Sequence, residues 1–152
     1  MNKPHHFFKN HYGERIINVQ EFVVSWISIH PEGQIYVGTD SKVRGDIVVY
    51  ATVICLWDVG RGVHEIFKTE IMKRPPDLYT RLWTEVSKAI EVAEILREIK
   101  PINVHIDINA DPRYNSNRLY DASIGLINSL GFIAAGKPYS WAATSGANRH
   151  CK

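Results

Sequence analysis

Cysteine is scarce in this sequence, and the two cysteines do not form a recognisable pair. Among 152 residues only Cys55 and Cys151 occur, without a CxxC spacing, which argues against a zinc knuckle. Cys55 lies in an apolar run and is interpreted as a small core residue. Cys151 is next to last, so a disulfide would tie a core strand to a fraying end. We therefore expect reduced thiols and a cytoplasmic location.

Long apolar runs and a strong net charge are also missing. The longest apolar stretch, residues 47–57, is about half of what a membrane helix needs, and the N-terminal residues lack the apolar core of a signal peptide. We expect neither a membrane span nor a targeting segment. The formal charge of +2, from 18 basic and 16 acidic residues, argues against nucleic-acid binding through bulk charge alone but is compatible with a local basic patch.

The remaining composition is that of a folded globular protein. Apolar residues make up 45% and charged residues 22%. A chain of this length is able to bury a hydrophobic core without metal or disulfide support. We predict a single domain over residues 1–152, with an N-terminal arm (1–13), an extra helical segment (14–31) and a core (34–152).

Apolar periodicity predicts the order helix, three strands, helix, strand, helix, strand, helix. Helices are expected after Asn18, over residues 78–99 and 118–130, and from Ser140 onward. Strands are expected at 34–42, 47–57, 63–72, 102–109 and 132–135. Short turns join the first three strands into an antiparallel meander, whereas the long helix after them allows the fourth strand to lie parallel to the first. The pattern indicates an α/β fold, a mixed sheet flanked by helices.

Glu85 is the most informative residue of the predicted 78–99 helix. At about 100° per residue it falls inside the apolar stripe, whereas Glu91, Glu94 and Glu98 fall on the opposite face. Burying an unpaired carboxylate costs several kcal/mol. Glu85 is therefore expected to be protonated, paired with a cation or bound to a metal, unless its place near the helix start lets it reach solvent.

Two further acids occupy awkward positions on predicted strands. Asp40 ends the first strand, where Gly38 is expected to leave open space beside it, and Asp107 lies inside the fourth strand. Each alone has a simpler explanation, as a strand-end cap or salt bridge. If the first and fourth strands are neighbours, Asp40, Glu85 and Asp107 converge and need a compensating cation. Mg²⁺ or Mn²⁺ fits such oxygen ligands, and two ions about 4 Å apart promote phosphodiester cleavage.

Four segments carry a more specific pattern: IYVGTDSK, LYTRLWTEVSKAIEVAE, VHIDIN and KPYSWAATSGANRH. Their sequence and order resemble the ribonuclease H-like superfamily, and more closely its bacterial YkuK-type family. The resemblance implies a five-stranded mixed sheet in the order 3-2-1-4-5, with an acidic cluster over its centre. It also implies that Asp40, Glu85 and Asp107 are catalytic metal ligands and that Asn148 stands where related nucleases place a fourth acid.

The amide of Asn148 is a departure from that pattern, because it is neutral and a weaker metal ligand than a carboxylate. Three outcomes stay open: one tightly bound ion, a second ion site completed by substrate, or lost activity. Asp111, in the loop after Asp107, is a less favoured candidate for the fourth acid.

Several polar residues around the three acids are candidates for substrate binding. His105 and Asn109 flank Asp107 on its face, although a strand histidine is more often only a hydrogen-bonded, half-buried residue. The full substrate-binding set is Ser41, Lys42, His105, Asn109 and Arg149. A phosphate-binding rim, or merely solvated charge, is expected from Lys42, Arg44, Lys73, Arg74, Arg149 and Lys152.

These features predict a divalent-metal-dependent nuclease that hydrolyses phosphodiester bonds of RNA, DNA or a hybrid. The alternative is a non-catalytic ribonuclease H-like module that binds nucleic acid or protein and holds at most a structural cation. A metal-independent hydrolase is disfavoured, because no GxSxG motif occurs and neither cysteine has a convincing base partner.

Overall fold

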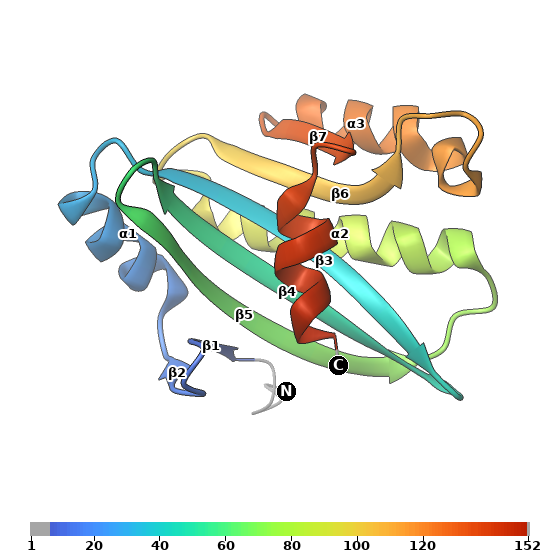
Figure 1. The fold of residues 1–152 in the computed structure, drawn as a ribbon, viewed down its shortest axis with the longest axis horizontal. Coiled ribbons are helices and arrows are strands. Elements are labelled where there is room, and N and C mark those ends of the chain that lie inside the picture. The colour runs from blue at the N-terminus through green and yellow to red at the C-terminus, as the bar shows by residue number, and fades with distance from the viewer. Residues whose placement is uncertain (1–6, 152) are drawn as a thin grey trace.

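A seven-stranded mixed sheet with helices on both faces forms the frame of the protein (Figure 1). The computed structural model describes residues 7–151, so residues 1–6 of the predicted arm and the predicted rim residue Lys152 lie outside the described residues. The strands are β1 (Phe8–Lys9), β2 (Arg15–Ile16), β3 (Gln34–Arg44), β4 (Ile47–Asp58), β5 (Gly62–Lys73), β6 (Ile102–Asn109) and β7 (Ile133–Lys137). The helices are α1 (Val19–Ile29), α2 (Leu78–Leu96) and α3 (Tyr120–Ser129), with shorter helical turns at Asn115–Leu119, Ala142–Ala147 and Asn148–His150.

The strand order confirms the predicted core and adds two strands to it. The order is β2-β1-β5-β4-β3-β6-β7, in which the last five strands are the predicted order 3-2-1-4-5. The sheet therefore has seven strands rather than five. The additional strands form because Phe8 is buried against the core, where Lys9 pairs with Phe67 on the otherwise open edge of β5.

The meander and the crossover follow from local chain features. β3, β4 and β5 are antiparallel neighbours, and Gly45, with φ of +60°, makes the tight β3–β4 turn. β4 is buried along nearly its whole length, as its Val- and Ile-rich sequence predicts. After α2, the chain returns as β6, which runs parallel to β3, and α3 then leads to β7 parallel to β6.

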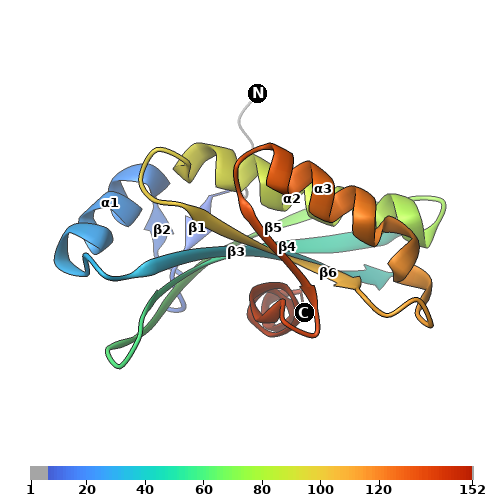
Figure 2. The same cartoon turned by 90° about the horizontal axis from the view of Figure 1, so that it is seen from above.

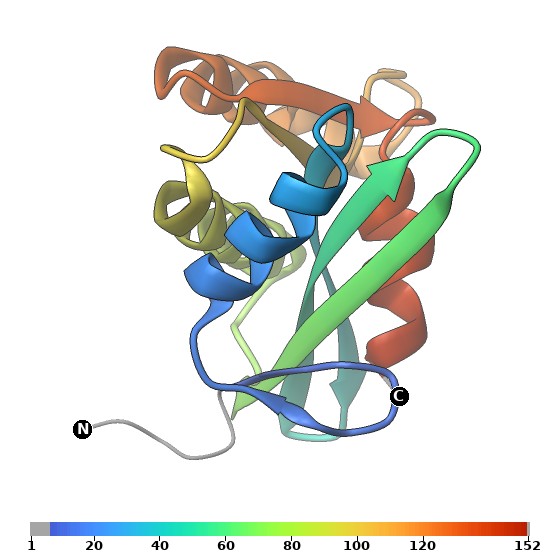
Figure 3. The ribbon, with the colours of Figure 1, turned by 90° about the vertical axis from the view of Figure 1, so that its left-hand side faces the viewer.

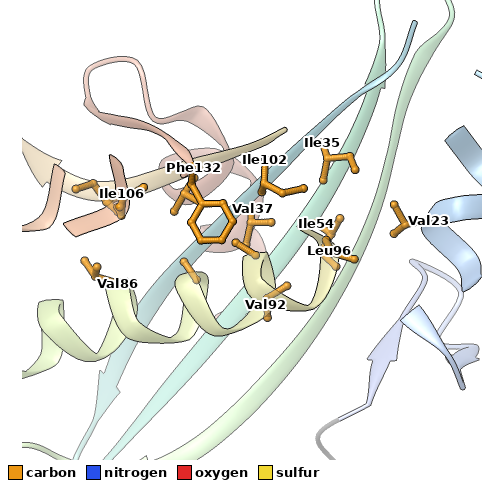
Figure 4. Packing of buried hydrophobic residues seen from close by; sticks show 14 of the residues in the cluster. Val23, Ile35, Val37, Ile54, Val86, Val92, Leu96, Ile102, Ile106 and Phe132 are labelled. Carbon is orange, nitrogen blue, oxygen red and sulfur yellow. The ribbon is translucent and has the colours of Figure 1, made fainter. Parts of the chain in front are cut away.

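The two faces of the sheet are covered unequally. α1, α2 and α3 lie on one face and the C-terminal residues on the other (Figures 2 and 3). Asp77 caps the start of α2, because its side chain accepts a hydrogen bond from the Thr80 amide at 2.7 Å. Its apolar stripe packs on the sheet, as the side chains in Figure 4 show. The main core includes Val23, Ile35, Val37, Ile54, Val86, Val92, Leu96, Ile102, Ile106 and Phe132.

The C-terminal segment (residues 142–150) differs from the regular helix that was predicted from Ser140 onward. Residues Ala142–Ala147 form a wider π-helical turn, followed by a 3-10 turn over Asn148–His150. The segment packs so closely on β3 that a Cβ atom at Gly38 would lie 2.5 Å from the Ala143 amide nitrogen. The open space expected beside Asp40 is therefore occupied by this backbone.

The C-terminal residues up to Cys151 are packed rather than frayed. The His150 ring stacks on Phe67 with centroids 3.7 Å apart, and its Nε2 lies 2.5 Å from Glu65 Oε1. Cys151 is consequently buried, and both Cys55 and Cys151 are free thiols. The expectation of a fraying end was wrong, because Cys151 is only 1% exposed, while the expectation of reduced thiols stays a prediction.

Candidate metal centre

Asp40, Glu85 and Asp107 converge at the point where β3 and β6 separate. One oxygen from each carboxylate lies within 4.8 Å of the others. The last register pair of β3 and β6 is Gly38 with His105, so Asp40 and Asp107 follow two residues further along each strand, beyond the paired region. Glu85 reaches this gap from α2, which covers the face of the sheet opposite the C-terminal segment (Figure 2). The predicted convergence is met, while the roles of these side chains stay predictions.

Asp107 lies in an irregular stretch of β6. Between His105 and Asn109, β6 advances four residues, whereas β7 advances only two, from Ala135 to Lys137. Such bulges bend a strand and re-aim its side chains, and they are common beside active sites. The irregularity frees Asp107 from the regular ladder at the position where it faces the other two acids.

Glu85 is held deep in the protein with one oxygen unpartnered. Its residue is only 4% exposed. Oε2 accepts a hydrogen bond from the Ser41 hydroxyl, whereas Oε1 is buried and has no hydrogen-bond partner among residues 7–151. Burial, followed by the charge of Asp40, raises the pKa of Glu85 well above its usual value.

Asp40 is the second buried acid, and its two oxygens have different partners. Oδ1 accepts from the Ser41 amide at 2.8 Å, and Oδ2 accepts from Asn148 Nδ2 at 2.7 Å. Burial, and after it the charge of Asp107, raises the pKa of Asp40 to about 6, although both hydrogen bonds favour the ionised form. The centre thus holds negative charge that water solvates poorly and that a cation would stabilise.

Lys137 belongs to this centre and was missed in the sequence analysis. Its Nζ lies 2.8 Å from Asp107 Oδ1. Burial lowers the pKa of Lys137, but the hydrogen bond and charge of Asp107 and the charges of Asp40 and Glu85 outweigh it, so the pKa is raised. The side chains of Lys137 and Asp107 are 40% and 19% exposed, so the centre is open to solvent on this side. One signal could have found Lys137. The carboxyl ends of parallel neighbouring strands meet at one edge of a sheet, so a residue at the end of β7 is expected near the end of β6.

Two predicted substrate-binding residues instead contact the protein itself. His105 is buried, and its Nδ1 accepts from the Ala142 amide at 3.1 Å, which anchors the C-terminal segment. Burial lowers the pKa of His105 to about 4, so the ring is neutral at pH 7. Asn109 Oδ1 accepts from the Asp111 amide at 2.9 Å and orders the loop after β6. Substrate binding by His105 and Asn109 remains a prediction.

The remaining candidate residues differ in whether they contact the three acids. Ser41 is part of the centre through its hydrogen bond to Glu85. Lys42 is exposed on β3. Arg149 Nε donates to the Ser145 carbonyl, and Arg149 Nη1 lies 3.9 Å from Glu65, so its guanidinium is directed toward β5. Asp111 pairs with Arg113 Nη2 at 2.5 Å, which disfavours it as the fourth acid.

The donor set fits a hard divalent cation. Three carboxylate oxygens within 4.8 Å are the ligand type that Mg²⁺ and Mn²⁺ prefer. Glu85 Oε1 is a buried acceptor that no donor from the described part of the chain satisfies. The centre is therefore able to hold a divalent metal ion.

Comparison with known proteins gives one family. A family profile described as Ribonuclease H-like matches residues 18–152, a range that runs from the start of α1 to the C-terminus and includes all three acids. No curated protein matches the chain. Within the described part of the chain, none of the helices has the length and apolar character needed to cross a membrane.

Proposed function

The chain belongs to the ribonuclease H-like family, and from this membership we propose that it is a divalent-metal-dependent nuclease acting on nucleic acid. The observation that carries the proposal is the convergence of Asp40, Glu85 and Asp107, with ligand oxygens within 4.8 Å of one another. Phosphodiester hydrolysis by this route needs oxygen ligands for a hard cation, and the three carboxylates provide them.

The residues of the chain have separable tasks in such a reaction. Asp40, Glu85 and Asp107 would hold Mg²⁺ or Mn²⁺, which when bound lowers the pKa of a water and stabilises charge on the phosphate. Ser41 fixes one oxygen of Glu85, and Asn148 fixes one oxygen of Asp40. Both acids are therefore oriented before substrate arrives, as electrostatic preorganisation requires.

Two arginines in a cavity near the start of α2 support an anionic substrate. Arg74 and Arg81 line a cavity of about 130 Å³ between the ends of β3 and β5 and the start of α2. Arg81 lies one helical turn before Glu85, and its buried Nε has no hydrogen-bond partner within the described residues. Asp77, which also lines the cavity, already accepts from the Thr80 amide. A phosphate next to the scissile one would give the Arg81 nitrogen a partner.

A cleavage assay tests the proposal directly. Labelled single-stranded, duplex and hybrid substrates are incubated with Mn²⁺, with Mg²⁺ or with EDTA. We expect metal-dependent cutting that falls about a hundredfold or more in Asp40→Asn, because a ligand and a charge are lost. Asp121→Asn, at an exposed position of α3, is the matched control and should cut normally. Cutting that persists in EDTA, or in Asp40→Asn, contradicts the proposal.

Asn148 favours a second candidate function, a binding module without catalysis. A neutral amide lies where related nucleases are expected to carry a fourth acid, and it donates to Asp40 as a structural contact would. Tight, metal-independent binding of the same substrates without any cutting would support this candidate.

A further inference from the structure

Each acid of the candidate metal centre already gives at least one oxygen to a donor from the protein. Asp107 Oδ1 contacts the Lys137 ammonium at 2.8 Å. Asp40 Oδ2 accepts from Asn148 Nδ2 at 2.7 Å, and Glu85 Oε2 accepts from the Ser41 hydroxyl. A two-ion site usually relies on carboxylates that use both oxygens to bridge the ions. Asp40 Oδ1 also accepts from the Ser41 amide at 2.8 Å, so protein donors already contact four of the six carboxylate oxygens, which leaves too few free oxygens to bridge two ions.

The charge of the centre also favours one bound divalent ion over two. With all three carboxylates ionised around a cation, the ammonium of Lys137 reduces their combined charge to minus two, before the charge of Arg81, which also acts on Glu85, is counted. One divalent ion neutralises that charge, whereas a second would leave the centre strongly positive. Asn148 adds no negative charge that could compensate a second ion.

The position of Lys137 is set by the fold rather than by a flexible surface chain. It is the last residue of β7 and pairs with Asn109 immediately after the irregular stretch that carries Asp107. The next residues lead into the C-terminal segment that carries Asn148. The same connection therefore brings both the ammonium and the amide to the acids.

From these contacts we infer that Lys137 supplies the positive charge that a second metal ion would otherwise supply, so that the centre binds a single divalent cation. The inference rests on the proposed metal centre and specifies its stoichiometry. Lys137 acts on the metal through Asp107 and is a positioning and charge-balancing residue.

Counting bound Mn²⁺ tests the inference without any activity measurement. Titration of the whole protein, followed by electron paramagnetic resonance of free Mn²⁺ and by calorimetry, should give one ion per chain. Lys137→Met keeps the length of the side chain but removes its charge. This variant should bind the ion at least about tenfold more tightly, because the positive charge of Lys137 no longer repels the cation. Lys137→Arg, which keeps the charge, should bind like the wild type.

Two further variants separate the charge effect from a general disturbance. Arg61→Met removes an exposed charge at the β4–β5 turn and should leave Mn²⁺ binding unchanged. The double variant Lys137→Met with Asn148→Asp combines four acids with no ammonium and should bind two ions. Circular dichroism and thermal unfolding show whether each variant is folded. The Mn²⁺ count of the wild type keeps the inference testable if Lys137→Met does not fold.

The outcomes distinguish this inference from the proposed function. Two ions per wild-type chain, or an unchanged affinity in Lys137→Met, overturn the single-ion inference and leave the nuclease proposal standing. Failure of the wild type to bind Mn²⁺ at all overturns both.

Discussion

Glu85 is the residue whose surroundings least suit its charge. Burial raises its pKa well above the usual value, and burial also raises the pKa of Asp40 to about 6. At pH values between the unfolded-state and the folded-state pKa values of these two acids, the folded, metal-free protein therefore keeps protons that the unfolded chain has released. The stabilising contribution of these groups is complete below about pH 4 and is lost as the pH rises through the folded-state values.

Replacing Glu85 by Gln should therefore stabilise the metal-free protein at pH 8. The amide oxygen still accepts from Ser41, while the uncharged NH₂ group takes the position of Oε1, which has no partner among the described residues. We expect a gain of roughly 1–3 kcal/mol in the free energy of unfolding, the usual cost of an unsatisfied buried polar group. Urea unfolding in EDTA at pH 5 and pH 8 measures it, and the gain should be smaller at pH 5.

Glu91→Gln on the exposed face of α2 is the control for this substitution. Its effect should stay within about 0.5 kcal/mol at both pH values. A Glu85→Gln protein that is less stable than the wild type at pH 8 would show that the buried carboxylate is compensated in the absence of metal.

Restoring the fourth acid by Asn148→Asp should have the opposite effect on the metal-free protein. A carboxylate would face Asp40 Oδ2 at the present hydrogen-bond distance of 2.7 Å. We expect a loss of roughly 1–3 kcal/mol at pH 8, which Mn²⁺ should reverse by binding more tightly than to the wild type. Thermal unfolding with EDTA and with Mn²⁺ measures both effects, with Asn115→Asp as an exposed control.

Among single residues, those with a local signal were predictable. Glu85 stood out because helical periodicity alone puts it among apolar neighbours, and Asp40 and Asp107 because strand interiors rarely hold aspartate. Lys137 had no such signal, because its contact with Asp107 depends on the parallel pairing of β6 and β7 and on the irregular register between them. The space beside Gly38 was misjudged for a similar reason, since the backbone that fills it comes from about a hundred residues further along the chain.

At the scale of elements, the close contact between β3 and the C-terminal segment connects packing to the metal centre. Gly38→Ala would bring a methyl group to 2.5 Å from the Ala143 nitrogen and 2.6 Å from the Ala142 carbonyl carbon, both backbone atoms. The segment must therefore shift, at a cost of about 1–3 kcal/mol. Because Asn148 lies on the same segment, Mn²⁺ binding should weaken as well. Urea unfolding and Mn²⁺ titration measure the two effects.

Gly125→Ala in α3 is the matched control for that substitution. Apart from its chain neighbours and the adjacent backbone of α3, no atom of residues 7–151 lies within 4 Å of a Cβ at this position, so the change should be neutral or stabilise by up to about 1 kcal/mol. If Gly38→Ala is tolerated equally well, the C-terminal segment does not depend on close approach to β3.

Elements with many internal contacts were predictable, and those made by edge pairing or packing were not. α2 was expected over residues 78–99 and extends over Leu78–Leu96, and β6 has the expected bounds. The two-residue strands β1 and β2 form only because the edge of β5 is available to pair with Lys9. The C-terminal segment widens into a π-helical turn over a sequence rich in alanine, where no periodic apolar stripe specifies a regular helix.

At the scale of the whole molecule, the candidate centre connects elements that are far apart in the sequence. The order of the core strands followed from short turns and one long crossover, which restrict a parallel β3–β6 pair to few topologies. Asp40, Glu85 and Asp107 come from β3, α2 and β6, so their oxygens converge only in the folded chain. A cation bound there should therefore stabilise the global fold rather than one local element.

The dependence of stability on Mn²⁺ concentration should report how many ions the folded chain binds. An ion that binds only the folded state adds RT ln(1 + [Mn²⁺]/Kd) to the free energy of unfolding. Well above Kd, one ion gives about 1.4 kcal/mol for each tenfold rise in Mn²⁺, and two ions give about twice that slope. We expect the single-ion slope for the wild type and a flat response for Asp40→Asn, measured by urea unfolding at fixed ionic strength. A slope near 2.8 kcal/mol would require a second ion, and a flat wild-type response would mean that the three converging acids do not bind Mn²⁺.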